Sequence, residues 1–155
     1  RGEAIALTAD CFEGNRVHIY RSMKHFKNGF QPLKTDSSER TITVDSHTMA
    51  MLEPWIRQAD PFVFGGVSSL AISTIDRAFR EGIRLSGVDP IRIHDLRHSH
   101  ASFLLNNGAN ILAVSKRLGH ATITQTLETY AHLMQDTDEK MMKIIENESK
   151  LSPKQ

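Results

Sequence analysis

The sequence predicts an α+β domain that is predominantly helical and carries one small three-stranded antiparallel sheet. Alternation of apolar and polar residues is confined to positions 15–45, which favours short strands there. From position 46 onward apolar residues recur at helical spacing, and no internal repeat or interdomain linker interrupts the chain. With 155 residues and 39% hydrophobic content, the chain suits a single domain with a buried core.

The signals for the sheet lie near the N-terminus. Residues 1–12 read as the end of a helix that runs into a turn. Alternation occupies residues 15–23 and returns in residues 40–45, and Asn28-Gly29 between them is a strong tight-turn dipeptide. We therefore expect three antiparallel strands, with a polar turn that carries Lys34 between the second and the third.

Two helices and an extended link are predicted next. The helix expected from Ser46 to Ala59 begins with a cap-like serine, and Pro54 is expected to kink or shorten it. Residues 61–66 form a short apolar run that two glycines end. A second helix is expected from Ser68 onward, with Gly87 near its end. Its expected buried stripe consists of Leu70, Ile72, Ile75, Phe79 and Ile83.

Four further helices are predicted in the C-terminal part of the chain. One begins at His94 and stops near Asn106-Asn107-Gly108, which is a C-terminal signal. A shorter helix is expected in the sequence ILAVSKRLGH, in which Leu118-Gly119 looks like a helix stop, with Lys116 and Arg117 facing outward. Another helix follows from Thr122 to Met134. Beyond Asp136, a last helix carries an apolar stripe made of Met141, Met142, Ile144 and Ile145.

Composition narrows the class of protein. No apolar run approaches the length needed to cross a bilayer, and residues 1–12 lack the layout of a secretory signal, so we expect a soluble cytoplasmic protein without membrane contact. Cys11 is the only cysteine, which excludes an internal disulfide and a cysteine-based zinc cage.

Charge is unevenly distributed along the chain although the formal net charge is only +1. Positive residues gather at Arg16, Arg21, Lys24, Lys27, Lys34 and Arg40, and again at Arg92, Arg97, Lys116 and Arg117. Acidic residues crowd the C-terminal end at Asp136, Asp138, Glu139, Glu146 and Glu148. This distribution predicts a basic working face and an acidic tail, but charge alone does not identify nucleic acid as the partner.

His94 and Arg97 form the centre of the predicted site. They are three residues apart at the start of a predicted helix, so both lie on one face near its N-terminus. Free backbone N–H groups and the helix dipole attract an anion there, and arginine adds a bidentate fork for phosphate oxygens. A zinc site is the alternative, because His94 and His98 are four apart, but the pattern lacks an intervening glutamate and a clear third ligand.

Three motifs occur in a fixed order: HDLRH at His94, LGH at His120 and TLETYAH around Tyr130. In type, order and spacing they resemble the tyrosine recombinase (phage integrase) family, and the resemblance runs through nearly the whole chain. It implies a catalytic domain over residues 1–150, with 151–155 as a tail. It also implies double-stranded DNA as substrate, no metal or cofactor, and a homotetramer on paired sites that is a monomer when free.

The resemblance assigns roles to residues of this sequence. Tyr130 would be the nucleophile, Arg97 would clamp the phosphate, His94 and His120 would supply hydrogen bonds and manage protons, and Lys34 would be the general acid. Two acidic residues, Glu3 and Asp95, would support the site. The expected DNA contacts are Lys34, Arg97, Lys116 and Arg117. His98 is expected to have no chemical role, and His100 is expected to be a satisfied core histidine.

One catalytic residue of the family has no counterpart in the sequence. The family carries R-x-G-E where this chain begins with Arg1-Gly2-Glu3, so Arg1 matches the variable position and the first catalytic arginine would precede it. We therefore expect a domain truncated at its N-terminus, without the DNA-binding arm. Two alternatives stay open: a DNA-binding fragment without catalysis, and a type IB topoisomerase-like strand transferase. The apolar stripe of the last helix either packs on its own domain or forms a surface for a neighbouring protomer.

Overall fold

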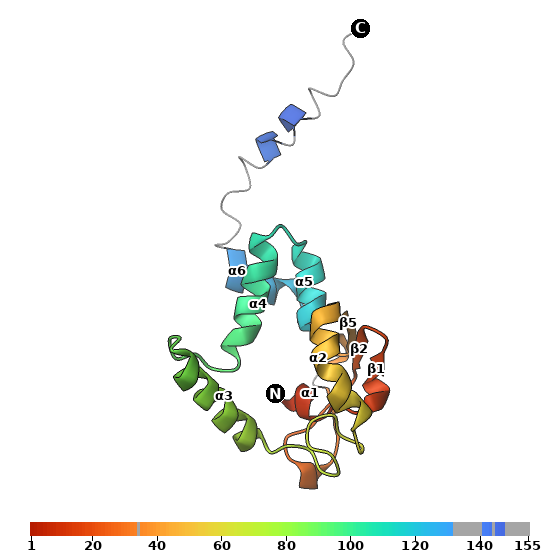
Figure 1. Cartoon of the computed structure of the whole chain (residues 1–155). Coiled ribbons are helices and arrows are strands. Elements are labelled where there is room, and N and C mark those ends of the chain that lie inside the picture. The colour runs from red at the N-terminus through yellow and green to blue at the C-terminus, as the bar shows by residue number, and fades with distance from the viewer. Residues whose placement is uncertain (34, 132–140, 144, 148–155) are drawn as a thin grey trace.

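The computed structural model describes residues 1–33, 35–131, 141–143 and 145–147 (Figure 1). The small strands and helices α1 and α2 lie on one side of the molecule, α3 lies on the other, and α4, α5 and α6 connect the two (Figure 1). Among the helices of these described residues, none combines the length and the apolar character that crossing a bilayer requires.

A three-stranded antiparallel sheet has the order β1 (Phe12–Glu13), β2 (Arg16–Ile19) and β5 (Arg40–Thr43). Val17 and Ile19 are buried while their neighbours on β2 are exposed, which is the alternation expected of a half-buried strand. The predicted kind of sheet is therefore confirmed. Its first strand, however, lies in the segment that was expected to be a turn.

The chain leaves this sheet after Ile19 and forms a separate pair of strands, β3 (Arg21–Ser22) and β4 (Gln31–Pro32). The reason is a competing contact. The Met23 backbone N–H donates to the Gly2 carbonyl oxygen at 3.0 Å, and the Met23 side chain is 1% exposed. Packing on the N-terminal segment therefore outweighs continuation of the sheet. Gly29, with φ of 65°, reverses the chain before β4 as the Asn-Gly dipeptide predicts.

The first hydrophobic cluster lies around α1 (Gly2–Ile5) and the 3₁₀ turn η1 (Ala9–Cys11). It consists of Ile5, Ala6, Met23 and Phe62, with Leu70, Ile72 and Ile75 packed against it. The extended link expected at residues 61–66 supplies Phe62, and the Val63 backbone N–H donates to the Leu7 carbonyl oxygen at 3.0 Å. The link thus closes over the N-terminal segment.

Helix α2 (Ser46–Arg57) begins where predicted, but its cap is Asp45 and not Ser46. The Asp45 carboxylate accepts from the Thr48 backbone N–H at 2.9 Å and from the Thr48 hydroxyl at 2.7 Å. The helix continues for three residues past Pro54, so this proline shortens the helix by little.

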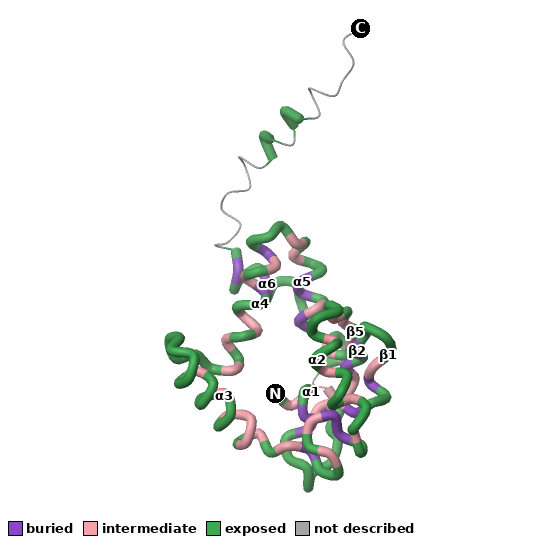
Figure 2. The backbone as a smooth tube through the Cα atoms, viewed as in Figure 1, coloured by how far each residue is buried: buried purple, intermediate pink, exposed green. Residues whose placement is uncertain are grey.

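Helix α3 (Ile72–Ser86) starts later than Ser68 and ends at Gly87, which has a left-handed conformation with φ of 70°. The prediction of a buried stripe on this helix is wrong, because none of its residues is buried (Figure 2). Ile75, Phe79 and Ile83 instead line an open apolar groove of about 660 Å³ together with Ile91 and Leu96. The helix stands apart from the rest, so the described chain covers only part of its apolar face.

The second hydrophobic cluster joins α4 (Asp95–Asn106), α5 (Ile111–Leu118) and α6 (Ile123–Tyr130). Its buried members are Ala101, Leu105, Val114, Leu118 and Tyr130. The end of α4 near Asn107 and the end of α5 at Gly119 agree with the sequence signals. Asn110 caps α5 by accepting from the Leu112 and Ala113 backbone N–H groups.

The predicted last helix falls only partly within the described residues. Residues 141–143 and 145–147 are helical, and Met141 and Met142 are exposed. Ile144 and the predicted domain boundary near 150 lie outside the described residues. Most of the acidic tail does so too, namely Asp136, Asp138, Glu139 and Glu148.

Candidate active site

The start of α4 carries His94 and Arg97 on one side of the helix, as their spacing predicts. His94 is the N-cap residue, and Asp95 fastens the turn before the helix by accepting from the Arg92 backbone N–H at 2.8 Å and from its guanidinium at 2.8 Å. These Arg92 hydrogen bonds lower the pKa of Asp95 to about 2. Asp95 therefore holds the turn at the start of α4, and its carboxylate binds Arg92.

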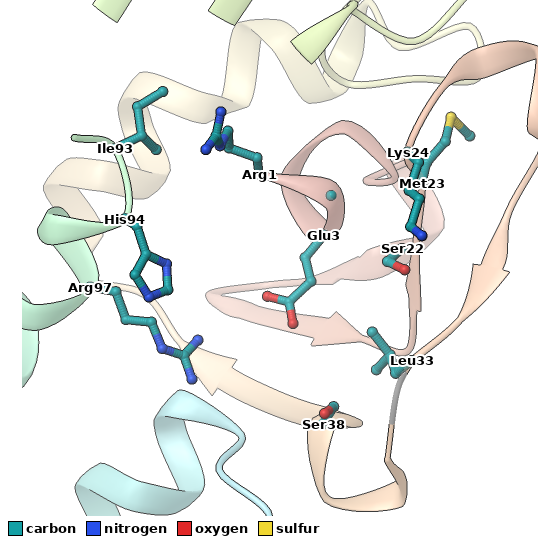
Figure 3. Close-up of a pocket in the computed structure, with 11 residues that line it drawn as sticks. Arg1, Glu3, Ser22, Met23, Lys24, Leu33, Ser38, Ile93, His94 and Arg97 are labelled. Carbon is teal, nitrogen blue, oxygen red and sulfur yellow. The ribbon is translucent and has the colours of Figure 1, made fainter. Parts of the chain in front are cut away.

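His94 and Arg97 line an open pocket of about 530 Å³ (Figure 3). The other residues that line it are Arg1, Gly2, Glu3, Ser22, Met23, Lys24, Leu33, Ser38 and Ile93. Figure 3 shows Glu3 and Arg97 reaching into the same space from α1 and α4. The side chain of Arg1 points elsewhere and pairs with Asp76 at 2.7 Å. The fold thus brings together residues that are more than ninety positions apart in the sequence.

Arg40 binds Glu3 and Ser38, which line this pocket, although the sequence indicates it only as one of several basic residues. Its side chain is 12% exposed and donates to both carboxylate oxygens of Glu3, at 3.0 and 2.9 Å. The strand alternation contained a signal for this placement, because Arg40 shares the inward face of residues 40–45 with Ile42 and Val44.

The LGH motif forms the turn that ends α5. Gly119 has φ of 70°, and the Arg97 guanidinium donates to the Leu118 carbonyl oxygen just before it. His120 follows and shares a hydrogen bond of 2.8 Å between its Nδ1 and the Thr126 hydroxyl. Burial, followed by the charges of Arg97, His98 and Arg40, lowers the pKa of His120. A neutral imidazole is therefore favoured beside Arg97.

Tyr130 is the last residue of α6 and is 3% exposed. Its ring packs in the second hydrophobic cluster, and its hydroxyl shares a hydrogen bond of 2.9 Å with Nδ1 of His98. Burial raises the pKa of Tyr130, and the positive charge of Arg97 opposes that shift. The sequence indicated no chemical role for His98 and did not indicate this contact, in which His98 is the hydrogen-bond partner of the candidate nucleophile.

The histidines form a continuous row from the pocket to Tyr130. The ring centroids of His94 and His98 are 5.2 Å apart, and those of His98 and Tyr130 are 6.0 Å apart. Burial and then the neighbouring charges of His98, Arg97 and Arg92 lower the pKa of His94. Burial and the charge of Arg40 also lower the pKa of Arg97. The site is thus a concentration of positive charge, in which Glu3 is the compensating carboxylate.

Two of the remaining predicted residues, Lys116 and Arg117, do not line the pocket. Lys34 lies outside the described residues, although Leu33 and Ser38 on either side of it line the pocket. Lys116 is exposed on α5, whereas Arg117 donates to the Thr43 carbonyl oxygen and to Nε2 of His100, both at 3.0 Å.

The expectation that His100 belongs to the core is wrong, because its side chain is exposed. Its Nε2 accepts a hydrogen bond from Arg117 in an exposed position, so the imidazole has a polar partner without belonging to the core. Within the described residues, no group of three histidine, cysteine or acidic side chains is arranged to hold a metal ion.

The geometry suits a reaction on a phosphodiester. Arg97 at the start of a helix offers a cation and a helix N-terminus to phosphate oxygens, and the neutral histidines can donate or accept protons. A phenol stands at the far end of the histidine row, at 2.9 Å from His98. These groups come from α1, β5, α4, α5 and α6.

A model of the phage integrase family matches residues 1–137 of this chain. Transposase A from transposon Tn554 of Staphylococcus aureus is 39% identical over 145 residues, which cover 85% of this chain and 39% of that protein. Tyrosine recombinase XerC of Xanthomonas axonopodis pv. citri is 36% identical over 106 residues, which cover 63% of this chain and 34% of that protein. The chain spans between 33% and 40% of the length of such curated relatives.

Solved structures share the fold. The Tn1549 transposon integrase in complex with a circular intermediate DNA matches with a TM-score of 0.76 and 20% sequence identity, over 94% of this chain and 54% of that one. At this identity the likeness concerns the fold, and it confirms the predicted class of a mostly helical domain with a small antiparallel sheet.

Proposed function

The chain belongs to the phage integrase family, and on that premise we propose that it is the catalytic domain of a tyrosine recombinase that cleaves and rejoins duplex DNA through a 3′-phosphotyrosyl intermediate. The observation that carries the proposal is the meeting of Arg97, His94 and Glu3 in one pocket, with His120 on the adjacent turn. Tyr130 lies next to this group through His98.

The chemistry follows from these groups. The Tyr130 phenolic oxygen attacks phosphorus, the bond from phosphorus to the 5′ oxygen breaks, and the strand remains attached to the enzyme by its 3′ phosphate. The phenolic proton passes to a base in the site, and the departing 5′ oxygen takes a proton, for which Lys34 is the proposed donor. The ester retains the bond energy, so rejoining needs no nucleotide.

Arg97 supplies the charge stabilisation in this scheme. A phosphoryl transition state spreads negative charge over the non-bridging oxygens, and a preorganised cation there stabilises it. His94 and His120, whose pKa values desolvation and the nearby cations lower, would donate hydrogen bonds to the same oxygens. Fixed side chains thus take the place of a metal ion.

Tyr130 must change partners before it attacks. Its hydroxyl is bound to His98 and its ring is buried, so the phosphate has to replace His98 as the contact of the hydroxyl. An unshifted tyrosine has a pKa of about 10. In the proposed reaction, the positive charge of Arg97 lowers the pKa of Tyr130 and so favours the phenolate.

Double-stranded DNA is the proposed partner, and the Tn1549 integrase of the same fold is bound to DNA in its structure. Arg97, Lys34, Lys116 and Arg117 are the proposed phosphate contacts. We further propose a monomer in solution that assembles into a tetramer on paired sites, because exchange between two duplexes requires four strand cleavages.

A nicked duplex substrate tests the function. Cleavage near the nick releases a short strand, so the covalent protein–DNA adduct accumulates and is seen on a denaturing gel. The probe is a pool of nicked duplexes of randomised sequence, given to the 155-residue chain and to a form with one arginine added before Arg1. The adduct is expected in at least the second form, and to vanish in Tyr130→Phe while persisting in the matched Tyr20→Phe variant.

The outcomes separate the alternatives. An added arginine that contacts the transition state should raise the rate by about a hundred- to a thousand-fold. DNA binding without adduct in either form would support a DNA-binding fragment, and an adduct that survives Tyr130→Phe would disprove the nucleophile. Relaxation of supercoiled plasmid by a monomer without site preference would favour the topoisomerase-like reading.

A further inference from the structure

We propose that Arg40 is a positioning residue of this site, whose single guanidinium holds the carboxylate of Glu3 and the turn at Gly119 in the geometry that Arg97 and His120 need. The proposal rests on the proposed function. It adds a residue that touches neither the phosphate nor the nucleophile, and that acts through the groups beside it.

All three guanidinium nitrogens of Arg40 are engaged by three separate parts of the chain. Nε donates to the Arg117 carbonyl oxygen at 2.8 Å, and Nη2 donates to Glu3 at 2.9 Å. Nη1 donates to Glu3 at 3.0 Å and to the Ser38 carbonyl oxygen at 2.9 Å. One side chain therefore joins α1, the segment before β5 and the end of α5.

The last turn of α5 is held by two arginines at adjacent carbonyl groups. Arg40 binds the Arg117 carbonyl oxygen and Arg97 binds that of Leu118. Carbonyl groups in the last turn of a helix lack intrahelical partners and attract cations. The position of Arg40 thus sets the position of the atom that Arg97 binds, and hence the direction in which the chain continues to His120.

Close packing leaves this turn little freedom. A Cβ atom built on Gly119 would lie 3.0 Å from Nη1 of Arg40 and 3.3 Å from its Cδ and Cζ atoms. The guanidinium therefore lies directly against the turn, and only glycine allows that approach. Moving Arg40 would move the backbone that carries His120.

The shape of arginine is required here as well as its charge. A guanidinium binds a carboxylate with two parallel hydrogen bonds and still directs Nε elsewhere, whereas a lysine ammonium is a single point of charge. Arg40→Lys therefore keeps the positive charge beside Glu3 but cannot serve Glu3 and the Arg117 carbonyl oxygen in the same way. Arg40→Lys therefore tests whether the site needs the hydrogen-bond geometry of Arg40 or only its positive charge.

The test compares Arg40→Lys and Arg40→Gln with wild type in whichever form of the chain makes the adduct. Three quantities are measured: the first-order rate of adduct formation at saturating DNA, the DNA Kd in a Tyr130→Phe background, and the pKa of the His120 imidazole by NMR. We expect both variants to lose about 10- to 100-fold in rate, because small displacements of catalytic groups have effects of this size. The Kd should change less than about threefold, since Arg40 does not contact DNA in the scheme.

The pKa of His120 distinguishes a positioning role from a general loss of structure. The charge of Arg40 contributes, after burial, Arg97 and His98, to the lowered pKa of His120. Arg40→Gln should raise that pKa, whereas Arg40→Lys should leave it nearly unchanged and still lose rate. A rate in Arg40→Lys within twofold of wild type would overturn the proposal.

Arg21→Gln is the matched control. Arg21 is also a half-buried arginine; it donates to the Ala6 carbonyl oxygen and pairs with Asp10 at 3.4 Å, and it is not among the residues that line the pocket. The Arg21→Gln substitution should lower the Tm without changing the rate of adduct formation by the folded protein. If neither Arg40 variant folds, Glu3→Gln is tested in their place. This substitution removes the carboxylate that Arg40 binds but keeps the hydrogen bonds of Arg40 to the Ser38 and Arg117 carbonyl oxygens. An unchanged rate of adduct formation in Glu3→Gln would overturn the proposal. Wild-type adduct that does not depend on Tyr130 would instead disprove the proposed function.

Discussion

Tyr130 is held in an unreactive form in the state that the structure describes. Its ring is packed among Ala101, Leu105 and Leu118, and its hydroxyl is bound by His98. Burial disfavours the phenolate, and only Arg97 acts in the opposite direction. The ionisation of Tyr130 is therefore a direct measure of its surroundings in the folded state.

An alkaline titration of tyrosinate absorbance tests this environment, because the chain contains only two tyrosines. In Tyr20→Phe, the remaining Tyr130 should titrate above the ordinary value of about 10, and Arg97→Gln should raise its pKa further. A raised pKa means that the neutral phenol is favoured in the folded state. Its contribution to stability is therefore full below about pH 10 and is lost as the pH rises through the folded pKa.

Tyr20 provides the internal comparison. Its hydroxyl donates to Asp10 at 2.7 Å, and this hydrogen bond raises the pKa of Tyr20 to about 12. In Tyr130→Phe, adding Asp10→Asn should bring the Tyr20 midpoint down toward its ordinary value, whereas Arg97→Gln should leave it unchanged. A Tyr130 midpoint at or below that of free tyrosine would contradict the buried environment.

The end of α5 shows how one element transmits position to the site. Gly119 reverses the chain in a left-handed conformation, and Arg40 occupies the space where a side chain would lie. Gly87 ends α3 with the same φ of 70°, but a Cβ atom there would meet nothing within 4 Å. Both glycines therefore need the left-handed backbone conformation, but only Gly119 also lies against a side chain, that of Arg40.

Alanine substitution at these two glycines should give different results. Gly87→Ala should lower the free energy of unfolding by about 1–2 kcal/mol, the cost of a left-handed conformation for an L-residue, with little change in cleavage rate. Gly119→Ala should be more destabilising, because Arg40 must also shift, and it should slow adduct formation. Chemical denaturation and the nicked-duplex assay measure both effects. Equal losses of stability and unchanged rates in the two variants would show that the Arg40 contact is unimportant.

At the scale of the whole molecule, the candidate site draws its residues from the surroundings of two separate hydrophobic clusters. One cluster contains Ile5, next to the site carboxylate of Glu3, and the other contains Leu118 and Tyr130. Arg40, with side-chain exposure of 12%, bridges the two through Glu3 and Arg117. The relative position of the clusters therefore decides whether the catalytic groups face one another.

The distribution of charge over the molecule predicts how DNA binding responds to salt. Lys116 is exposed on α5, and Lys116→Ala should weaken binding to all duplex sequences alike and reduce the slope of log K against log salt by about 0.9. Arg84→Ala is the control, because Glu81 already binds the Arg84 guanidinium at 2.6 Å and offsets its charge. Fluorescence anisotropy at several salt concentrations gives both slopes. An unchanged slope for Lys116→Ala would remove it from the DNA contacts.

Local signals in the sequence determined much of the fold. The Asn-Gly dipeptide, the stop after Asn106 and Asn107, and Gly119 act through local backbone conformation, so the reversal before β4 and the ends of α4 and α5 could be predicted without a structure. The motifs around His94 and Tyr130 likewise sufficed to recognise the family.

Tertiary structure alone decided which groups meet. Packing of Met23 on α1 diverted β3 from the sheet, and the position of α3 left its apolar stripe only partly covered. The placement of His98 against Tyr130 and of Arg40 between Glu3 and the end of α5 depends on contacts between residues 32 to 77 positions apart. Periodicity and spacing describe only neighbours along the chain, and hydrogen bonds across such separations arise from the packing of whole elements.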